Sequence, residues 1–256
     1  MRKSIVHIIF ATIGIVLALA LAGAAVVWGY QSKPSDEPCK ALTYTITAYS
    51  DEATIYITEQ ELNQLLQEQD IYPVGRAVNR VSLQRMENTI RRHPLVLQAE
   101  CYLTRWNEIR VTVRQRRPIV TVKSRDGAFL VDSKRRVLPF YEIHEWTLPV
   151  TGNVGAQLAC TQLADFAEWL LDNDYWRGRI RLVEVRTPNN IRLRLKDYPS
   201  VIVLGRMNDY ERKLRKLRTF LEDGQDEVGD KKYREIDIRF RGQVIGRDLL
   251  TEDNKN

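Results

Sequence analysis

Residues 93–120, "HPLVLQAECYLTRWNEIRVTVRQRRPIV", contain two runs with the composition of β-strands. The runs, 95–103 and 109–115, are rich in residues that fit the pleated surface of a sheet, and the polar segment "TRWNE" between them is typical of a turn. His93 and Pro94 come just before the first run, where proline is expected to end a helix. The stretch therefore predicts a helix end followed by two strands.

The sequence before this stretch predicts one strand and two helices. Thr58 and Glu61 have the spacing of a capping box, and Ser82 is a favourable first residue for a second helix. Leu62, Leu65 and Leu66 then share one face of the first helix. The predicted order is a strand at 42–49, helices at 57–69 and 82–94, and the strands at 95–103 and 109–115.

The sequence after residue 117 predicts short strands with two longer helices, at 156–174 and 208–223. The runs 179–186 and 190–197 form a predicted hairpin around the turn "TPNN". The second run should bury one face and leave a basic one. Its apolar residues are Ile191, Leu193 and Leu195, and its basic residues are Arg192, Arg194 and Lys196. In the last helix, the basic residues expected to face solvent are Arg212, Lys213, Arg215, Lys216 and Arg218.

The N-terminal segment carries no charged residue from Ser4 until Lys33, which is long enough to span a bilayer. Arg2 and Lys3 precede it, so the N-terminus is expected in the cytoplasm and the bulk of the chain outside. We expect a cytoplasmic tail at 1–4, a single transmembrane helix at 5–28 and a linker at 29–40. A cleaved signal peptide is the alternative, because "ALALAGAA" offers small residues, but the apolar run is longer than such peptides use.

Composition and charge identify no ligand. The 39 basic and 33 acidic residues give a net charge of +6, which is compatible with several anionic partners. Aromatic residues are not interleaved with the basic ones, as stacking readers of nucleic acid require, so we expect no nucleic-acid partner. The three cysteines, Cys39, Cys101 and Cys160, allow one disulfide at most, and the pairing stays open.

No motif for catalysis or for cofactor binding is present in the sequence. It lacks a nucleophile elbow, a zinc motif, a phosphate-binding glycine loop and a dinucleotide fingerprint. His144 lies in a loop-like segment without a second ligand, and His93 is interpreted as a helix-end residue. Asp126 and Asp132 fall at predicted turns. We therefore expect no enzyme activity, metal, cofactor or small-molecule substrate.

The order of these parts resembles the FtsQ/DivIB type of bacterial cell-division protein. The resemblance covers essentially the whole chain and is most specific in the stretch 93–120. "FLVDSKRRVLP", "LPVTG", "VIVLG" and "EIDIRF" are similar to further segments of the family. Gln115 stands where the family usually has Glu, and "SDEATIYIT" at 50–58 is longer than usual. The matching positions of the main stretch are Pro94, Val96, Ala99, Ile109, Val111, Val113, Arg116 and Pro118.

The resemblance implies an α+β protein with a single membrane anchor. A POTRA domain of order β-α-α-β-β is expected at 41–116, a mainly antiparallel β domain with flanking helices at 117–247, and a tail at 248–256. The implied function is that of a non-enzymatic scaffold at the division septum of the inner membrane. It would hold FtsB-like and FtsL-like proteins and other divisome components, and it would help regulate septal peptidoglycan synthesis.

The segment "EIDIRFRGQVI", residues 235–245, is expected to be an open edge strand to which a partner adds a strand. Ile236, Ile238 and Phe240 are assigned to the core by alternation, with the residues between them pointing away. The resemblance places partner contact on Arg239 and Phe240, with Gly242 following. The candidate partner-binding residues are Asp237, Arg239, Phe240, Arg241 and Gly242.

Two other classes of function stay open at this point. One is a membrane-anchored cell-wall enzyme. The other is an envelope assembly factor or chaperone that binds extended client peptides through its POTRA domain.

Overall fold

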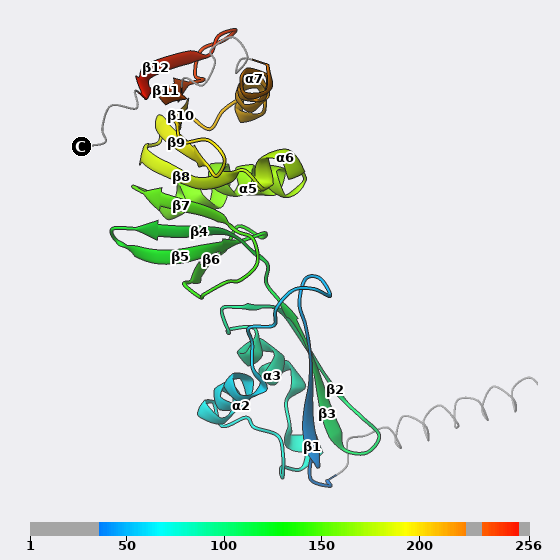
Figure 1. Ribbon diagram of the computed structural model, residues 1–256. Coiled ribbons are helices and arrows are strands. Elements are labelled where there is room, and N and C mark those ends of the chain that lie inside the picture. Colours follow the sequence, from blue (N-terminus) through cyan, green and yellow to red (C-terminus); the bar gives the residue numbers. More distant parts are fainter. Residues whose placement is uncertain (1–35, 224–231, 251–256) are drawn as a thin grey trace, which may run out of the picture. The chain divides into compact units, whose positions relative to one another are not determined.

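The computed structural model describes residues 36–223 and 232–250 (Figure 1). The expected tail at 1–4 and transmembrane helix at 5–28 lie outside the described residues. Within them, no helix combines the length and the apolar character that crossing a membrane requires. The chain divides into two compact units. The first comprises the described residues up to Thr45 with Thr58–Arg92 and Gln98–Val113, and the second comprises Ile46–Ile57, His93–Leu97 and the described residues from Arg114 onward.

The first unit is built on a three-stranded sheet of order β1-β3-β2. Both of its helices lie on the same side of that sheet (Figure 1). The predicted order of strand, helix, helix, strand, strand is confirmed. The elements are β1 (Ala41–Thr47), α2 (Glu59–Glu68), a 3-10 turn (Val78–Arg80), α3 (Leu83–Ile90), β2 (Val96–Leu103) and β3 (Glu108–Gln115).

The predicted caps fix where the two helices begin. Thr58 and Glu61 form the full capping box of α2, and the Ser82 hydroxyl accepts a hydrogen bond from the Arg85 backbone N–H at the start of α3. The helices then bury their apolar faces. The buried residues include Leu62, Leu66, Met86 and Ile90 from the helices and Ala99, Ile109, Val111 and Val113 from the strands.

Residues 36–40, which were expected to belong to a linker, are part of the first unit. The Cys39 backbone N–H donates to the Arg76 carbonyl at 2.8 Å, and the Cys39 side chain is only 2% exposed. The Lys40 N–H donates to the Asn107 carbonyl at 2.9 Å. The expectation was wrong because these polar, proline-containing residues satisfy their backbone groups by pairing with two loops of the unit.

The second unit contains a nine-stranded mixed sheet of order β12-β11-β10-β9-β8-β7-β4-β5-β6. The adjacent pairs β4–β7, β7–β8 and β10–β11 are parallel, and the other adjacent pairs are antiparallel. The strands are β4 (Pro118–Ser124), β5 (Gly127–Asp132), β6 (Val137–Pro139), β7 (Leu148–Gly152), β8 (Ile180–Thr187), β9 (Asn190–Leu195), β10 (Val201–Gly205), β11 (Lys232–Asp237) and β12 (Ile245–Leu250).

Helices cover one face of this sheet. The predicted helix at 156–174 is divided into α4 (Ala156–Leu158), a π-helical turn (Ala159–Leu163), α5 (Ala164–Leu171) and the separate short helix α6 (Asp174–Arg177). The last helix, α7 (Tyr210–Glu222), is confirmed. Phe166 and Leu170 of α5 and Leu214 and Leu217 of α7 pack in one core cluster with the strands.

One basic residue of α7 does not face solvent as predicted. The Lys213 ammonium is buried and donates to the Arg206 carbonyl at 2.8 Å and to Asn208 Oδ1 at 3.3 Å. Burial lowers the pKa of Lys213. The helical pattern did not predict this because the side chain reaches back over its own turn to a loop that ends β10.

Candidate functional site

The segment expected to be an open edge strand lies inside the sheet. β11 ends at Asp237 and is flanked by β10, to which it is parallel, and by β12, to which it is antiparallel. The prediction of a free edge on residues 235–245 is therefore wrong, and part of the expected tail at 248–256 belongs to β12. The sequence signal that was missed is Gly242, whose φ of +78° suits a turn between two strands.

The five candidate residues are brought together in space, but not in the predicted arrangement. Asp237 was expected to point outward and is 0% exposed, whereas Phe240 was expected in the core and is 42% exposed. The alternation fails because the strand ends at Asp237, and Arg239, Phe240, Arg241 and Gly242 form the loop that joins β11 to β12. Ile236 and Ile238 are buried as predicted.

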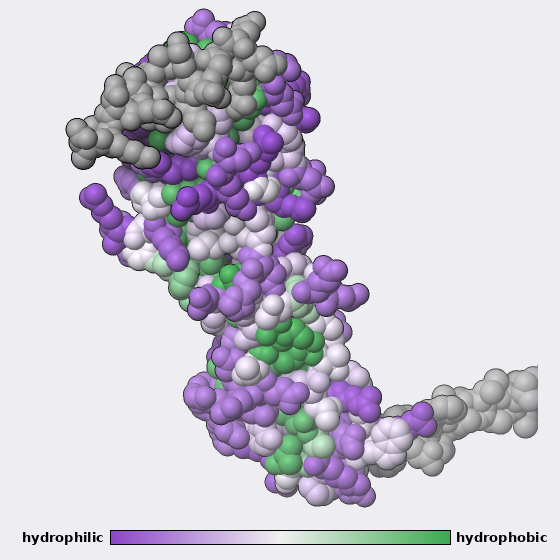
Figure 2. Space-filling view, viewed as in Figure 1, coloured by the Kyte–Doolittle hydropathy of each residue, from purple (hydrophilic) through white to green (hydrophobic). Residues whose placement is uncertain are grey.

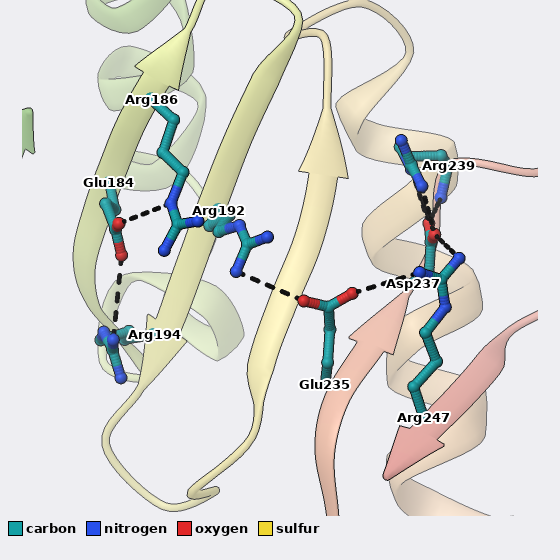
Figure 3. A network of polar contacts seen from close by, with 8 residues as sticks. All are labelled: Glu184, Arg186, Arg192, Arg194, Glu235, Asp237, Arg239 and Arg247. Carbon is teal, nitrogen blue, oxygen red and sulfur yellow. Dashed lines mark hydrogen bonds and ion pairs between the residues drawn. The ribbon is translucent and has the colours of Figure 1, made fainter. Parts of the chain in front are cut away.

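Asp237 is held by two arginines (Figure 3). Its carboxylate accepts hydrogen bonds from Arg239 Nε at 2.9 Å, from Arg239 Nη2 at 2.6 Å and from Arg247 Nη2 at 3.2 Å. Burial pushes the pKa of Asp237 upward, but the hydrogen bonds and charge of Arg239, with Arg247, outweigh it and hold the pKa below its usual range. The buried carboxylate thus fixes one side chain of the loop and one of β12.

The charged network continues across neighbouring strands (Figure 3). Glu235 on β11 lies 3.3 Å from Arg192 on β9 and 3.7 Å from Arg247 on β12. Glu184 on β8 pairs with Arg186 at 3.0 Å and with Arg194 at 3.8 Å. The predicted division of β9 into a buried and a basic face is confirmed, because Ile191 and Leu193 are buried and Arg192 and Arg194 lie on the opposite face. Acidic side chains pair with both arginines, from β11 with Arg192 and from β8 with Arg194.

A lysine of α7 also holds the loop that joins β11 to β12. Lys216 Nζ donates to the carbonyl oxygens of Phe240, Gln243 at 2.9 Å and Ile238 at 3.4 Å. Its pKa is lowered by burial and by the nearby charge of Arg212. Sequence reasoning assigned Lys216 to the solvated face of its helix, because nothing in the local pattern shows which carbonyl oxygens come near.

A glycine of β10 makes room for the loop. Gly205 has a φ of +77°, and a Cβ there would lie 2.8 Å from the Arg239 side chain. The loop is therefore fixed by contacts with α7, β10 and β11. Beyond it, β12 is an end strand of the sheet, so its outer backbone groups have no strand partner among the described residues.

Comparison with known families gives two matches. A model described as "FtsQ/DivIB, C-terminal related" matches residues 117–247, and one described as a POTRA-like domain matches residues 37–114. The chain belongs to the FtsQ/DivIB C-terminal-related family. No match to an individual curated protein was found. The family match covers β11, the loop after it and the first half of β12, so the site described above lies in the family-defining part of the chain.

The site of this FtsQ/DivIB-related chain consists of paired charged side chains beside a strand at the end of the sheet. Among the described residues, no group of three or more His, Cys, Asp or Glu side chains is arranged to hold a metal ion. His144 lies in the loop between β6 and β7, and Asp126 lies in an exposed turn, as predicted. Cys39, Cys101 and Cys160 are free thiols. What the site offers instead is an open strand edge beside an exposed aromatic side chain and several arginines.

Proposed function

We propose that this chain is a non-enzymatic scaffold of the bacterial division machinery. In this proposal it is anchored in the inner membrane by residues 5–28 and carries a POTRA domain at 41–116 and a β domain at 117–247 outside the membrane. It holds FtsB-like and FtsL-like proteins at the septum and helps to regulate septal peptidoglycan synthesis. The membership of the chain in the FtsQ/DivIB-related family supports the role, and the unpaired outer edge of β12 supports the mode of binding.

The partner is proposed to add a strand to β12 rather than to β11. An edge strand presents unpaired N–H and C=O groups, so main-chain hydrogen bonds supply affinity and side chains supply specificity. Phe240 is exposed in the loop that leads into β12, and Arg247 lies within the strand. An apolar side chain and acidic side chains on the added strand would complement these two residues.

Two adjacent proline substitutions test this mode. Successive N–H groups of a strand point to opposite edges, so one of Asp248→Pro and Leu249→Pro removes a hydrogen bond to β11 and the other removes only an outward donor. We expect the variant that loses a hydrogen bond to β11 to unfold more easily. The variant that loses only the outward donor should stay as stable as the wild type but lose capture of an FtsB-like protein. Thermal unfolding tells the two apart. Unchanged capture by the stable variant would refute strand addition at β12.

A pull-down from crosslinked cells separates the scaffold from the main alternative. Division proteins as the dominant catch of the full chain support the scaffold. Outer-membrane precursors as the dominant catch would instead support an envelope assembly factor that binds client peptides. If the chain is the scaffold, the stable proline variant should in addition no longer capture the division proteins.

A further inference from the structure

The most exposed large apolar side chain of the described residues belongs to the first unit, whereas the site above belongs to the second. Trp106, at 65% exposure, stands at the tip of the hairpin formed by β2 and β3. Hydrophilic residues cover most of the face drawn in Figure 2, and a few green patches interrupt them. An indole this open contributes nothing to the core. A single exposed apolar side chain is ordinary on a protein surface, so the surroundings of Trp106 in the fold decide what it can contact.

The tip that carries Trp106 is held in one conformation. The Thr104 hydroxyl accepts hydrogen bonds from the backbone N–H groups of Trp106 at 3.4 Å and Glu108 at 3.2 Å. The Thr104 N–H donates to the Glu108 carbonyl at 2.8 Å, and Asn107 adopts a left-handed φ of +60°. The turn therefore presents Trp106 without further ordering, which lowers the entropic cost of binding.

The same tip is fastened to the first described residues of the chain. The Lys40 N–H donates to the Asn107 carbonyl at 2.9 Å, and the Asn107 side chain donates to Glu37. Figure 1 shows the start of β1 and the turn between β2 and β3 at the same end of the three-stranded sheet. Val74, another exposed apolar residue at this end, forms a backbone bridge with Cys39.

The segment between the proposed anchor and this tip is short. The nine residues 29–37 separate the end of the proposed anchor from Glu37, and nine residues span at most about 30 Å when fully extended. With the proposed anchor, this reach allows the tip that carries Trp106 to meet the bilayer surface. Tryptophan favours this interface because its ring is apolar and its N–H is polar. At this end Lys40, Arg80 and Arg105 form no ion pair with other described residues. The same holds for Asp36 and Glu37, which accept hydrogen bonds from the neutral side chains of Asn79 and Asn107.

We infer that the β2–β3 hairpin tip, with Trp106 as its apolar contact, docks on the lipid interface of the membrane that holds the anchor. This inference rests on the anchor of the proposed function but not on the partner at β12. The neighbouring Arg105 extends toward lipid phosphates while the indole enters the interface. The contact fixes the first unit against the membrane surface.

The full chain in lipid nanodiscs tests the docking through quenching of tryptophan emission by brominated acyl chains. The nanodiscs contain phosphatidylcholine and phosphatidylglycerol, and a Trp28→Phe background removes the indole at the end of the anchor. Four of the five tryptophans then remain. We expect brominated lipid to quench part of this emission, and the quenched part to disappear when Trp106→Phe is added. Adding Trp169→Phe instead, which removes an indole packed on the core of the second unit, should leave it.

Equal quenching of the Trp28→Phe chain with and without Trp106→Phe would overturn the inference. If bromolipid quenches the wild type more than the Trp28→Phe chain in that case, the anchor stands and only the hairpin contact fails. If it does not, the anchor and the hairpin contact fail together. Capture of the partner at β12 is measured separately in each case. Because Trp106 is exposed, its replacement should leave the thermal unfolding midpoint unchanged.

Discussion

Arg116 and Asp132 form a buried ion pair, with Nη1 and Oδ2 separated by 2.7 Å. Asp132, predicted to lie at a turn, is the last residue of β5, and its Oδ1 accepts from the backbone N–H groups of Lys134 at 2.9 Å and Arg136 at 2.7 Å in the turn that follows. The other oxygen binds the arginine that precedes the first strand of the large sheet. One carboxylate thus fixes both the β5–β6 turn and the start of β4.

Asp132→Asn should therefore destabilise the second unit strongly. Removing one member of a buried ion pair leaves the other charge uncompensated, which typically costs about 3–5 kcal/mol. Urea unfolding of the full chain measures the loss. Asp126→Asn, at an exposed turn of the same sheet, is the matched control and should change stability by less than about 0.5 kcal/mol. Equal effects of the two substitutions would show that the pair contributes no specific stability.

Gln115→Glu, which restores the residue usual in the family, should also destabilise this chain. Gln115 Oε1 accepts from the Tyr56 N–H at 2.7 Å while Nε2 donates to the Thr54 carbonyl at 2.9 Å. A carboxylate cannot donate, so the contact of this buried side chain with the Thr54 carbonyl would become repulsive, at a cost of about 1–3 kcal/mol. Gln67→Glu, on the exposed side of α2, serves as the control in the same urea titration. A Gln115→Glu chain as stable as the wild type would show that the hydrogen bond from Gln115 to the Thr54 carbonyl does not stabilise the fold.

Much of the fold follows from local sequence signals, and the site does not. Thr58, Glu61 and Ser82 predict helix starts through contacts within one turn of chain, and these predictions are confirmed. The buried state of Asp237 depends on Arg247, which lies in a strand that alternation did not predict. Likewise, Lys216 finds its carbonyl partners more than twenty residues away in sequence. Such long-range contacts leave no periodic signal in the chain.

Gly205→Ala tests whether the loop after β11 depends on the space at β10. The substitution places a Cβ against Arg239 and forces a left-handed φ on alanine, so we expect a loss of about 1–3 kcal/mol. It should also weaken the Arg239–Asp237 pair, so that partner capture falls together with stability. Gly155→Ala is the control, because a Cβ there meets no atom within 4 Å. Thermal unfolding and capture are measured on both variants.

The lowered pKa of Asp237 predicts a contribution to stability at low pH. A carboxyl whose pKa is lower in the folded than in the unfolded state stabilises the fold above its unfolded pKa, about 3.9. This contribution is lost as the pH falls through the folded pKa. The charged groups that face Asp237 are Arg239 and Arg247, which stay protonated throughout. Between pH 5 and acid unfolding, the stability of Asp237→Asn should fall less steeply than that of the wild type, as urea titrations at each pH would show. Parallel curves would contradict the pKa direction.

Lys216→Met should separate the presentation of the loop from the stability of the domain. The substitution removes the hydrogen bonds to Phe240, Gln243 and Ile238 but keeps the apolar stem, so the loop loses its fixed conformation while the core of α7 is retained. We expect partner affinity to fall about tenfold, or about 1.4 kcal/mol, because ordering the loop then opposes binding.

Lys213→Met, one turn earlier on the same helix, is the matched comparison because Lys213 holds the loop after β10 and does not bond the loop after β11. It should lower stability with little change in affinity once folded. Lys216→Arg should restore part of the affinity, since a guanidinium also donates to several carbonyl oxygens. Titration of the partner by isothermal calorimetry, next to thermal unfolding, checks all three variants. If Lys216→Met and Lys213→Met reduce affinity equally, the bonds from Lys216 do not act by presenting the loop.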